Sequence, residues 1–172
     1  VFNYTEVRSL IKEMGKTIGV EAHDKLNGVT VQIKAKKIVS AVGAWTDIFL
    51  DKEHAQAPQK IRPTKGVHIV YRGQVSDHAV LIPTQSDKRI FFMIPWQGNS
   101  LIGTTDTDYY DSPDNVGVEE EDVDYLFKEA KRVFPEVDFK REDILTTFAG
   151  LRPLAFNEGS PSKVSRKHII EE

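Results

Sequence analysis

The strongest chemical signal in the sequence is Arg152, which lies in the segment GLRPL at 150–154. Glycine, leucine and proline are not the usual neighbours of a solvated surface arginine. Burying a guanidinium group is costly unless it is paired, so an anion or a cluster of carbonyl groups is expected to face Arg152. Its planar fork suits two-pronged recognition of phosphate or carboxylate. We favour a site for an anionic ligand, and an internal salt bridge stays open as the alternative.

A second cluster lies in the segment RPTKGVH at 62–68. Arg62 and Lys65 carry charges that attract anions, and His68 offers an imidazole that acts as a general base or a hydrogen-bond donor near neutral pH. Gly66 allows unusual backbone angles beside them. The spacing alone favours the plainer interpretation, in which both cations are solvated and His68 is an ordinary half-buried strand residue.

A third cluster, SAVGAW at 40–45, takes an apolar segment into a turn of small residues. Small residues such as Ala41 and Gly43 at the carboxyl end of a strand let a ligand approach the backbone, and open α/β sheets bind cofactors at such ends. The pattern by itself favours a tight strand-to-helix turn packed by Trp45.

The acidic segment GTTDTD at 103–108 invites comparison with a calcium loop. The third ligand position would be Tyr110 and the required glycine would be Asp111, so the EF-hand pattern fails. We expect these threonines and aspartates to bond the backbone at a sheet edge, with no metal.

Composition excludes several classes of protein. The chain has 172 residues, a net charge of −3 and no cysteine, which excludes disulfides, thiolate metal sites and a cysteine nucleophile. A mildly acidic chain lacks the basic surface of a nucleic-acid binder, and no apolar stretch approaches the roughly 20 residues of a membrane span. The chain starts at Val1 and stops at Glu172 without clear end signals, so we expect a piece of a larger protein.

The first fifty residues have an α/β pattern. Helical spacing of apolar residues, closed by Gly15, predicts a helix over Thr5–Met14. The remaining elements expected here are two strands joined through Asn27-Gly28, a strand buried on both faces and a short helix: Thr17–Ala22, Val29–Ala35, Lys37–Val42 and Trp45–Leu50. The polar residues 51–60 then mark the best candidate boundary.

Beyond residue 60, short strands alternate with turns, which is typical of a largely antiparallel sheet. One amphipathic helix is expected over Glu119–Val133, ended by Pro135. The expected strands are Gly66–Tyr71, Ala79–Pro83, Arg89–Ile94, Ser100–Thr104, Ile144–Ala149 and Lys163–Ile170.

Taken in order, these segments resemble the FAD-dependent glycerol-3-phosphate dehydrogenases and glycerol-3-phosphate oxidases. The resemblance is colinear and covers almost the whole chain. KGVH, IPW, GTTDTDY and GLRPL are specific together, although each is weak alone. The matching segments are KIVSAVGAWTD (37–47), RPTKGVH (62–68), RIFFMIPWQG (89–98), LIGTTDTDY (101–109), DYLFKEAKRVFP (124–135) and AGLRPL (149–154).

The resemblance implies a flavoprotein of the D-amino-acid-oxidase-like superfamily, with an α+β (mixed α/β) fold. Residues 1–50 would be part of an FAD-binding α/β domain, 51–60 a linker, 61–147 a mostly antiparallel β-sheet substrate domain with packed helices, and 148–172 a return segment toward the FAD domain. The reaction implied is oxidation of sn-glycerol 3-phosphate to dihydroxyacetone phosphate by hydride transfer to FAD, with a quinone or oxygen as the final acceptor. Such an enzyme is cytoplasmic, and its quinone-linked form sits at the inner face of the cell membrane.

The resemblance also implies roles for single residues. His68 would be the active-site histidine, and Arg152 and Arg166 would bind substrate together with it. Three further positions would face the cofactor: Ala41, Gly43 and Gly150. The family usually has Asn where Ser40 stands, and its glycine-rich FAD segments are not found before Val1 or after Glu172. The chain alone is therefore expected neither to hold FAD tightly nor to turn over.

Two other functions stay open. One is a non-catalytic domain that binds phosphate esters through Arg152 and Arg166. The other is part of an amine or amino-acid oxidase of the same superfamily, against which KGVH and GTTDTDY argue.

Overall fold

The structure is a computed structural model that describes residues 1–53, 58–156 and 169–170. The chain divides into two compact units, Val1–Gln59 and Lys60–Glu172. The division falls in the polar segment 51–60. Which unit serves a cofactor and which a substrate stays a prediction.

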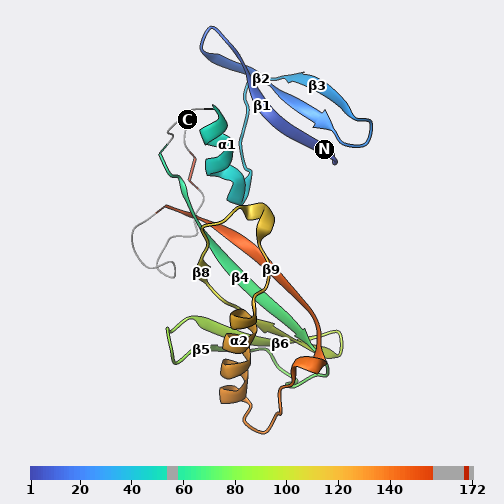
Figure 1. The fold of residues 1–172 in the computed structure, drawn as a ribbon, viewed down its shortest axis with the longest axis vertical. Helices are drawn as coiled ribbons and strands as arrows, with labels where there is room; N and C mark the ends of the chain where they lie inside the picture. The colour runs from blue at the N-terminus through green and yellow to red at the C-terminus, as the bar shows by residue number, and fades with distance from the viewer. Residues whose placement is uncertain (54–57, 157–168, 171–172) are drawn as a thin grey trace. The chain divides into compact units, whose positions relative to one another are not determined.

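The first unit contains a three-stranded antiparallel sheet, β1 (Thr5–Glu13), β2 (Lys16–Asp24) and β3 (Val29–Lys34), in that order. A short 3-10 helix, Gly43–Trp45, leads into α1, Thr46–Glu53 (Figure 1). The backbone N–H of Leu10 on β1 donates to Glu53 Oε1 over 2.8 Å, which ties α1 to this sheet. The predicted β2–β3 hairpin and the predicted short helix are both confirmed.

The predicted helix over Thr5–Met14 is wrong, because this segment forms strand β1. The strand pairing shifts between Val7 and Ser9 and again between Ile11 and Lys12. Each irregularity breaks the two-residue alternation of a strand, so the apolar residues fall at a spacing that imitates a helix. Gly15, with φ of 76°, belongs to the hairpin turn between β1 and β2 rather than to a helix end.

The predicted buried strand Lys37–Val42 is also wrong. The segment is irregular, and Val39 is 88% exposed. A strand buried on both faces needs neighbours on its edges and layers above and below it. Among the described residues, none of the paired strands includes this segment, so its apolar side chains are not covered.

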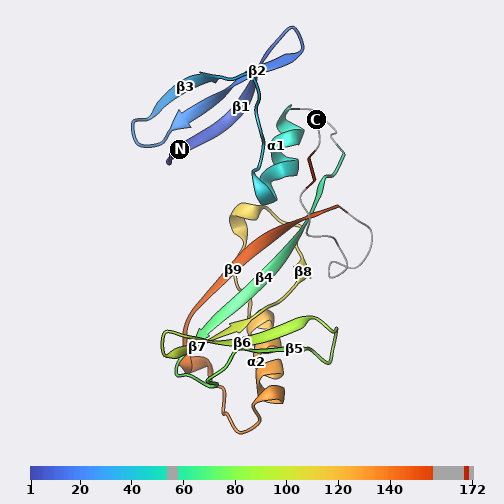
Figure 2. The same cartoon turned by 180° about the vertical axis from the view of Figure 1, so that it is seen from behind.

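The second unit is built around β4 (Ile61–Tyr71). One edge of β4 pairs along its length with β9 (Ile144–Ala155), and the other pairs with β7 (Asn99–Gly103) and β8 (Thr107–Asp108). The full order is β5-β6-β7-β4-β8 with β9 on β4, all antiparallel; β5 is Val80–Pro83 and β6 is Ile90–Trp96. Figure 1 and Figure 2 show β4 and β9 as two long strands side by side.

The five strands expected between residues 66 and 149 are confirmed, and β9 is longer than predicted, so that Arg152 lies within a strand. The β6–β7 hairpin closes with Gln97 and Gly98, whose φ values of 50° and 75° suit a tight two-residue turn. Most of the strand predicted over Lys163–Ile170 lies outside the described residues; its last two are not in a strand.

Alternation along β4 gives the sheet one covered and one open face. Val67, Ile69 and Tyr71 point to the covered face, where they form the core with Phe91, Met93 and Ile102. Helix α2 (Glu120–Val133) covers that face with Val123, Leu126 and Ala130, as its apolar stripe predicts. Side chains of Glu119 and Asp122 form a capping box at its start.

Lys65, expected to be solvated or to attract an anion, is instead buried on the covered face. Its Nζ lies 2.6 Å from Glu119 Oε2 and 2.8 Å from Asp122 Oδ2. Burial alone lowers the pKa of Lys65, but the two carboxylates outweigh it and the pKa is raised. Arg62 is likewise bound to Asp108, with Nε 2.6 Å from Oδ1. Both cations therefore hold the fold together.

Thr105 fills the gap between β7 and β8 along the edge of β4. Its hydroxyl accepts from the N–H of Val67 over 3.0 Å and donates to the carbonyl of Lys65 over 3.2 Å. The side chain thus completes the ladder where no strand runs, as expected for threonine at a sheet edge.

Replacing Thr105 with Val keeps the shape and leaves the buried N–H of Val67 without an acceptor. We expect a loss of about 1–3 kcal/mol in the free energy of unfolding, measured by urea denaturation. Thr107→Val is the matched control, because Thr107 is exposed. Equal effects of the two substitutions would refute the role of Thr105.

Candidate functional site

The strand register places His68 and Arg152 on the open face of the second unit. On β4, Thr64, Gly66 and His68 alternate with the core residues and point to this face. Their partners on β9 are Arg152, Gly150 and Phe148, in that order. His68 and Arg152, which are 84 positions apart in the sequence, thereby lie on one face of the sheet, with the Gly66–Gly150 pair between them.

Arg152 is held by a short segment that follows β7. Its Nη1 donates to the carbonyl of Thr105 over 3.2 Å and to Asp106 Oδ1 over 3.3 Å, and its Nη2 donates to Thr104 Oγ1 over 2.9 Å. The guanidinium lies against Gly66, where an added Cβ would meet Arg152 Cζ at 2.8 Å. Any side chain at this position would displace the guanidinium from its place.

Arg152 still has hydrogen-bond donors to offer. The three bonds leave its Nε–H and one hydrogen of Nη2 without a partner among residues 1–53, 58–156 and 169–170, and its side chain is 27% exposed. The carbonyl and anion expected around Arg152 are both present. The internal ion pair with Asp106 and room for an anionic ligand thus coexist.

His68 is surrounded by apolar groups. Its ring stacks on Phe148 at 4.8 Å between centroids with 13° between planes, and Phe92 lies tilted at 5.5 Å. The Cδ2 edge of the ring lies over Gly103, where an added Cβ would meet it at 2.5 Å. Burial first, and the charge of Arg152 second, lower the pKa of His68 below its usual 6.5, so the ring is neutral at pH 7.

Gly66 and Gly150 face each other between the His68 and Arg152 positions. Space above Gly150 is open, since an added Cβ would meet nothing within 4 Å. Arg152 covers Gly66, but the bare backbone of Gly150, beside an imidazole and an arginine, allows a flat ring to approach closely. These residues therefore fit the flavin that the resemblance implies, and the role of Gly150 toward it stays a prediction.

The other predicted cofactor positions lie in the first unit. Ala41 is exposed, and Gly43 has φ of 60° with open space around it. Trp45, expected to pack this turn, is 44% exposed. The backbone here is accessible, and its role toward a cofactor stays a prediction. Arg166 lies outside the described residues.

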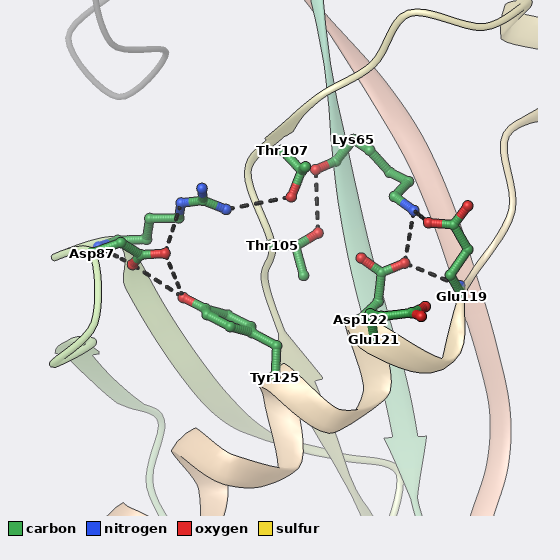
Figure 3. A pocket seen from close by; sticks show the side chains of 9 residues that line it. Lys65, Asp87, Thr105, Thr107, Glu119, Glu121, Asp122 and Tyr125 are labelled. Atoms are coloured by element: carbon green, nitrogen blue, oxygen red, sulfur yellow. Dashed lines mark hydrogen bonds and ion pairs between the residues drawn. The ribbon is translucent and has the colours of Figure 1, made fainter.

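The covered side of β4 carries a separate polar pocket of about 290 Å³ (Figure 3). Most of its charged groups are paired with one another: Lys65 with Glu119 and Asp122, and Arg89 with Asp87, which also accepts from Tyr125. In this part of the structure the charges stabilise the fold, and we assign no ligand to the pocket.

Sequence reasoning missed the residues that hold His68 and Arg152. Thr104 and Asp106 belong to a segment predicted to be structural, and nothing local links them to Arg152. Phe148 carried a usable signal, because it precedes Gly150 and Arg152 at the two-residue spacing of one strand face.

The lowered pKa of His68 has a consequence for stability. In the unfolded chain, His68 binds a proton near pH 6.5, whereas in the folded chain it does so only at lower pH. The free energy of unfolding should therefore fall as the pH drops through 6.5. His68→Gln should weaken this dependence in urea denaturation between pH 7.5 and 5. An unchanged pH dependence would contradict the assignment to His68.

The chain is similar to known proteins over nearly its whole length. The chain is 39% identical over 171 residues to the aerobic glycerol-3-phosphate dehydrogenase of Bacillus subtilis, covering 98% of this chain and 31% of that protein. It is 39% identical over 176 residues to the enzyme of the same name from Staphylococcus aureus (strain COL), covering 100% and 32%. The chain thus spans about a third of the length of these curated relatives.

Solved structures give the same result. The glycerol-3-phosphate dehydrogenase of Bacillus halodurans complexed with FAD matches with a TM-score of 0.82 and 38% identity, over 90% of this chain and 32% of that one. Glycine oxidase of Bacillus cereus matches with a TM-score of 0.58 and 23% identity, over 88% and 38%, which shows a shared fold alone.

A family model described as FAD dependent oxidoreductase matches residues 1–168. The mixed α/β fold with antiparallel sheets is the one expected from the resemblance. The chain belongs to the FAD-dependent oxidoreductase family.

Proposed function

We propose that this chain is the central part of a flavoenzyme that oxidises sn-glycerol 3-phosphate to dihydroxyacetone phosphate. The observation that carries the proposal is the open sheet face, where Arg152 keeps unused donors beside a neutral His68 and the bare backbone of Gly150. The identity to aerobic glycerol-3-phosphate dehydrogenases supports the choice of substrate.

The proposal concerns the full-length protein, because this chain spans only about a third of its relatives. Residues 1–50 are assigned to the FAD-binding domain, 61–147 to the substrate domain, and 148–172 to the return segment. Ala41, Gly43 and Gly150 are assigned to the cofactor, since each presents accessible backbone. The chain alone is expected to be inactive.

Each residue of the open face has a physical task in this proposal. FAD, when bound, supplies the acceptor for the hydride that leaves C2. Arg152 binds the phosphate through charge-assisted hydrogen bonds, with Arg166 as the second arginine. Phe92 and Phe148 pack against the ring of His68 and limit its contact with water, and His68 meets the C2 oxygen.

The electrons then pass to a quinone or to oxygen. We propose a cytoplasmic enzyme whose quinone-linked form binds the inner face of the cell membrane, which rests on the resemblance. No helix in the described part of the chain is long and apolar enough to cross a membrane. Reoxidation of the reduced enzyme by a quinone analogue and by oxygen, measured separately, tells the acceptors apart.

Arg152→Gln in the full-length protein tests the substrate assignment. We expect the second-order rate constant for flavin reduction by glycerol 3-phosphate to fall by about ten- to a hundredfold, because a charge-assisted hydrogen bond to the phosphate is lost. Reduction by glycerol, which has no phosphate, should change much less. Arg72→Gln is the matched control, since Arg72 is an exposed, ion-paired arginine elsewhere in this unit.

Stopped-flow absorbance of the flavin under anaerobic conditions gives both rates. If the protein binds phosphate esters but glycerol 3-phosphate does not reduce its flavin, the result would favour the non-catalytic binding domain instead. If Arg152→Gln lowers the rate of flavin reduction equally with glycerol and with glycerol 3-phosphate, Arg152 does not bind the phosphate.

A further inference from the structure

The two ring nitrogens of His68 have different surroundings. Nδ1 is buried and has no hydrogen-bond partner among the described residues. Nε2 is not among the buried atoms without a partner, and no residue within 58–156 forms a hydrogen bond with it, so it is the nitrogen available to a ligand. A histidine that acts as a general base usually donates Nδ1–H to a carbonyl or carboxylate, which fixes its tautomer.

Packing contacts, rather than a hydrogen bond to Nδ1, hold the imidazole ring of His68 in place. A single row of residues crosses the open face from β5 to β9, and its members are strand partners in register: Leu81, Phe92, Gly103, His68 and Phe148. Phe148 stacks flat on the imidazole, Phe92 lies against it at a tilt, and the missing side chain of Gly103 leaves room for its edge. These contacts orient the ring without choosing a tautomer.

Burial then decides between the two tautomers. With hydrogen on Nδ1, a buried N–H would lack an acceptor, which costs about 1–3 kcal/mol. With hydrogen on Nε2, that nitrogen becomes the donor and the buried Nδ1 keeps only a lone pair, a lesser penalty. A general base would also have to become imidazolium, with Nδ1–H in this apolar setting and Arg152 nearby.

We propose that His68 meets substrate as a hydrogen-bond donor through Nε2–H, in an orientation set by Phe92, Phe148 and Gly103, and that it is not the general base. This deepens the proposed function and rests on it. The donor stabilises the negative charge that grows on the C2 oxygen while the hydroxyl proton passes to water and the hydride leaves C2 for the flavin. Phe92, Phe148 and Gly103 are positioning residues.

Nitrogen NMR of the full-length holoenzyme, labelled with 15N-histidine, reads the tautomer directly. The resonances of His68 are assigned by their loss in His68→Gln. We expect a hydrogen on Nε2 and a lone pair on Nδ1 at pH 7.5. Hydrogen on Nδ1 would overturn the proposal. This measurement needs no turnover, so it stands even if glycerol 3-phosphate proves not to be the substrate.

The rate of flavin reduction in two variants of His68 distinguishes a hydrogen-bond donor from a general base. The side-chain amide of His68→Gln can still donate, so we expect flavin reduction within about tenfold of the unsubstituted enzyme, with a much larger loss in His68→Leu. Removing a general base costs about 10²–10⁴-fold whichever residue replaces it. Equal losses in the two variants would overturn the donor role.

Phe148→Ala tests the positioning. Phe148 is 49% exposed, and Phe156, 46% exposed, provides a matched control. Removing Phe148 opens Nδ1 to water, so the NMR spectrum should show both tautomers and the pKa of His68 should rise toward 6.5. Phe156→Ala should change neither. An unaltered tautomer and pKa of His68 in Phe148→Ala would contradict the role of Phe148 in keeping Nδ1 buried.

Discussion

The pairing register between β4 and β9 is the constraint on which the second unit depends. It sets Thr64 opposite Arg152, Gly66 opposite Gly150 and His68 opposite Phe148. Because strand side chains alternate, a slip of one residue on β4 would send His68 into the core and Val67 to the open face. The same register that buries the core therefore assembles the site, and neither can change without the other.

Local patterns predicted most of the elements. Helix α2 and the β6–β7 hairpin follow from spacing and turn residues within one segment. The failures have non-local causes: irregular pairing with β2 made β1 imitate a helix, and residues 37–42 need neighbouring strands that the described residues do not provide. The partners of Arg152 lie 46–48 residues away, so only its need for partners was predictable.

The cations on the two faces of β4 differ in how fully they are paired. On the covered face, Lys65 is matched by Glu119 and Asp122, so the pocket there is balanced by the protein itself. On the open face, Arg152 is matched by one carboxylate and two neutral acceptors and keeps donors in reserve. A paired buried charge stabilises a fold, whereas a partly exposed cation with unused donors attracts an anion.

The open face also holds its two functional side chains by different means. Polar bonds from Thr104, Thr105 and Asp106 fix the guanidinium of Arg152, which must keep its charge to bind phosphate. Apolar contacts fix the imidazole of His68, which they keep neutral. A hydrogen bond from Nδ1–H to a carbonyl or carboxylate would have made the ring more basic, and the absence of such an acceptor among the described residues, with Arg152 close by, favours a donor over a proton acceptor.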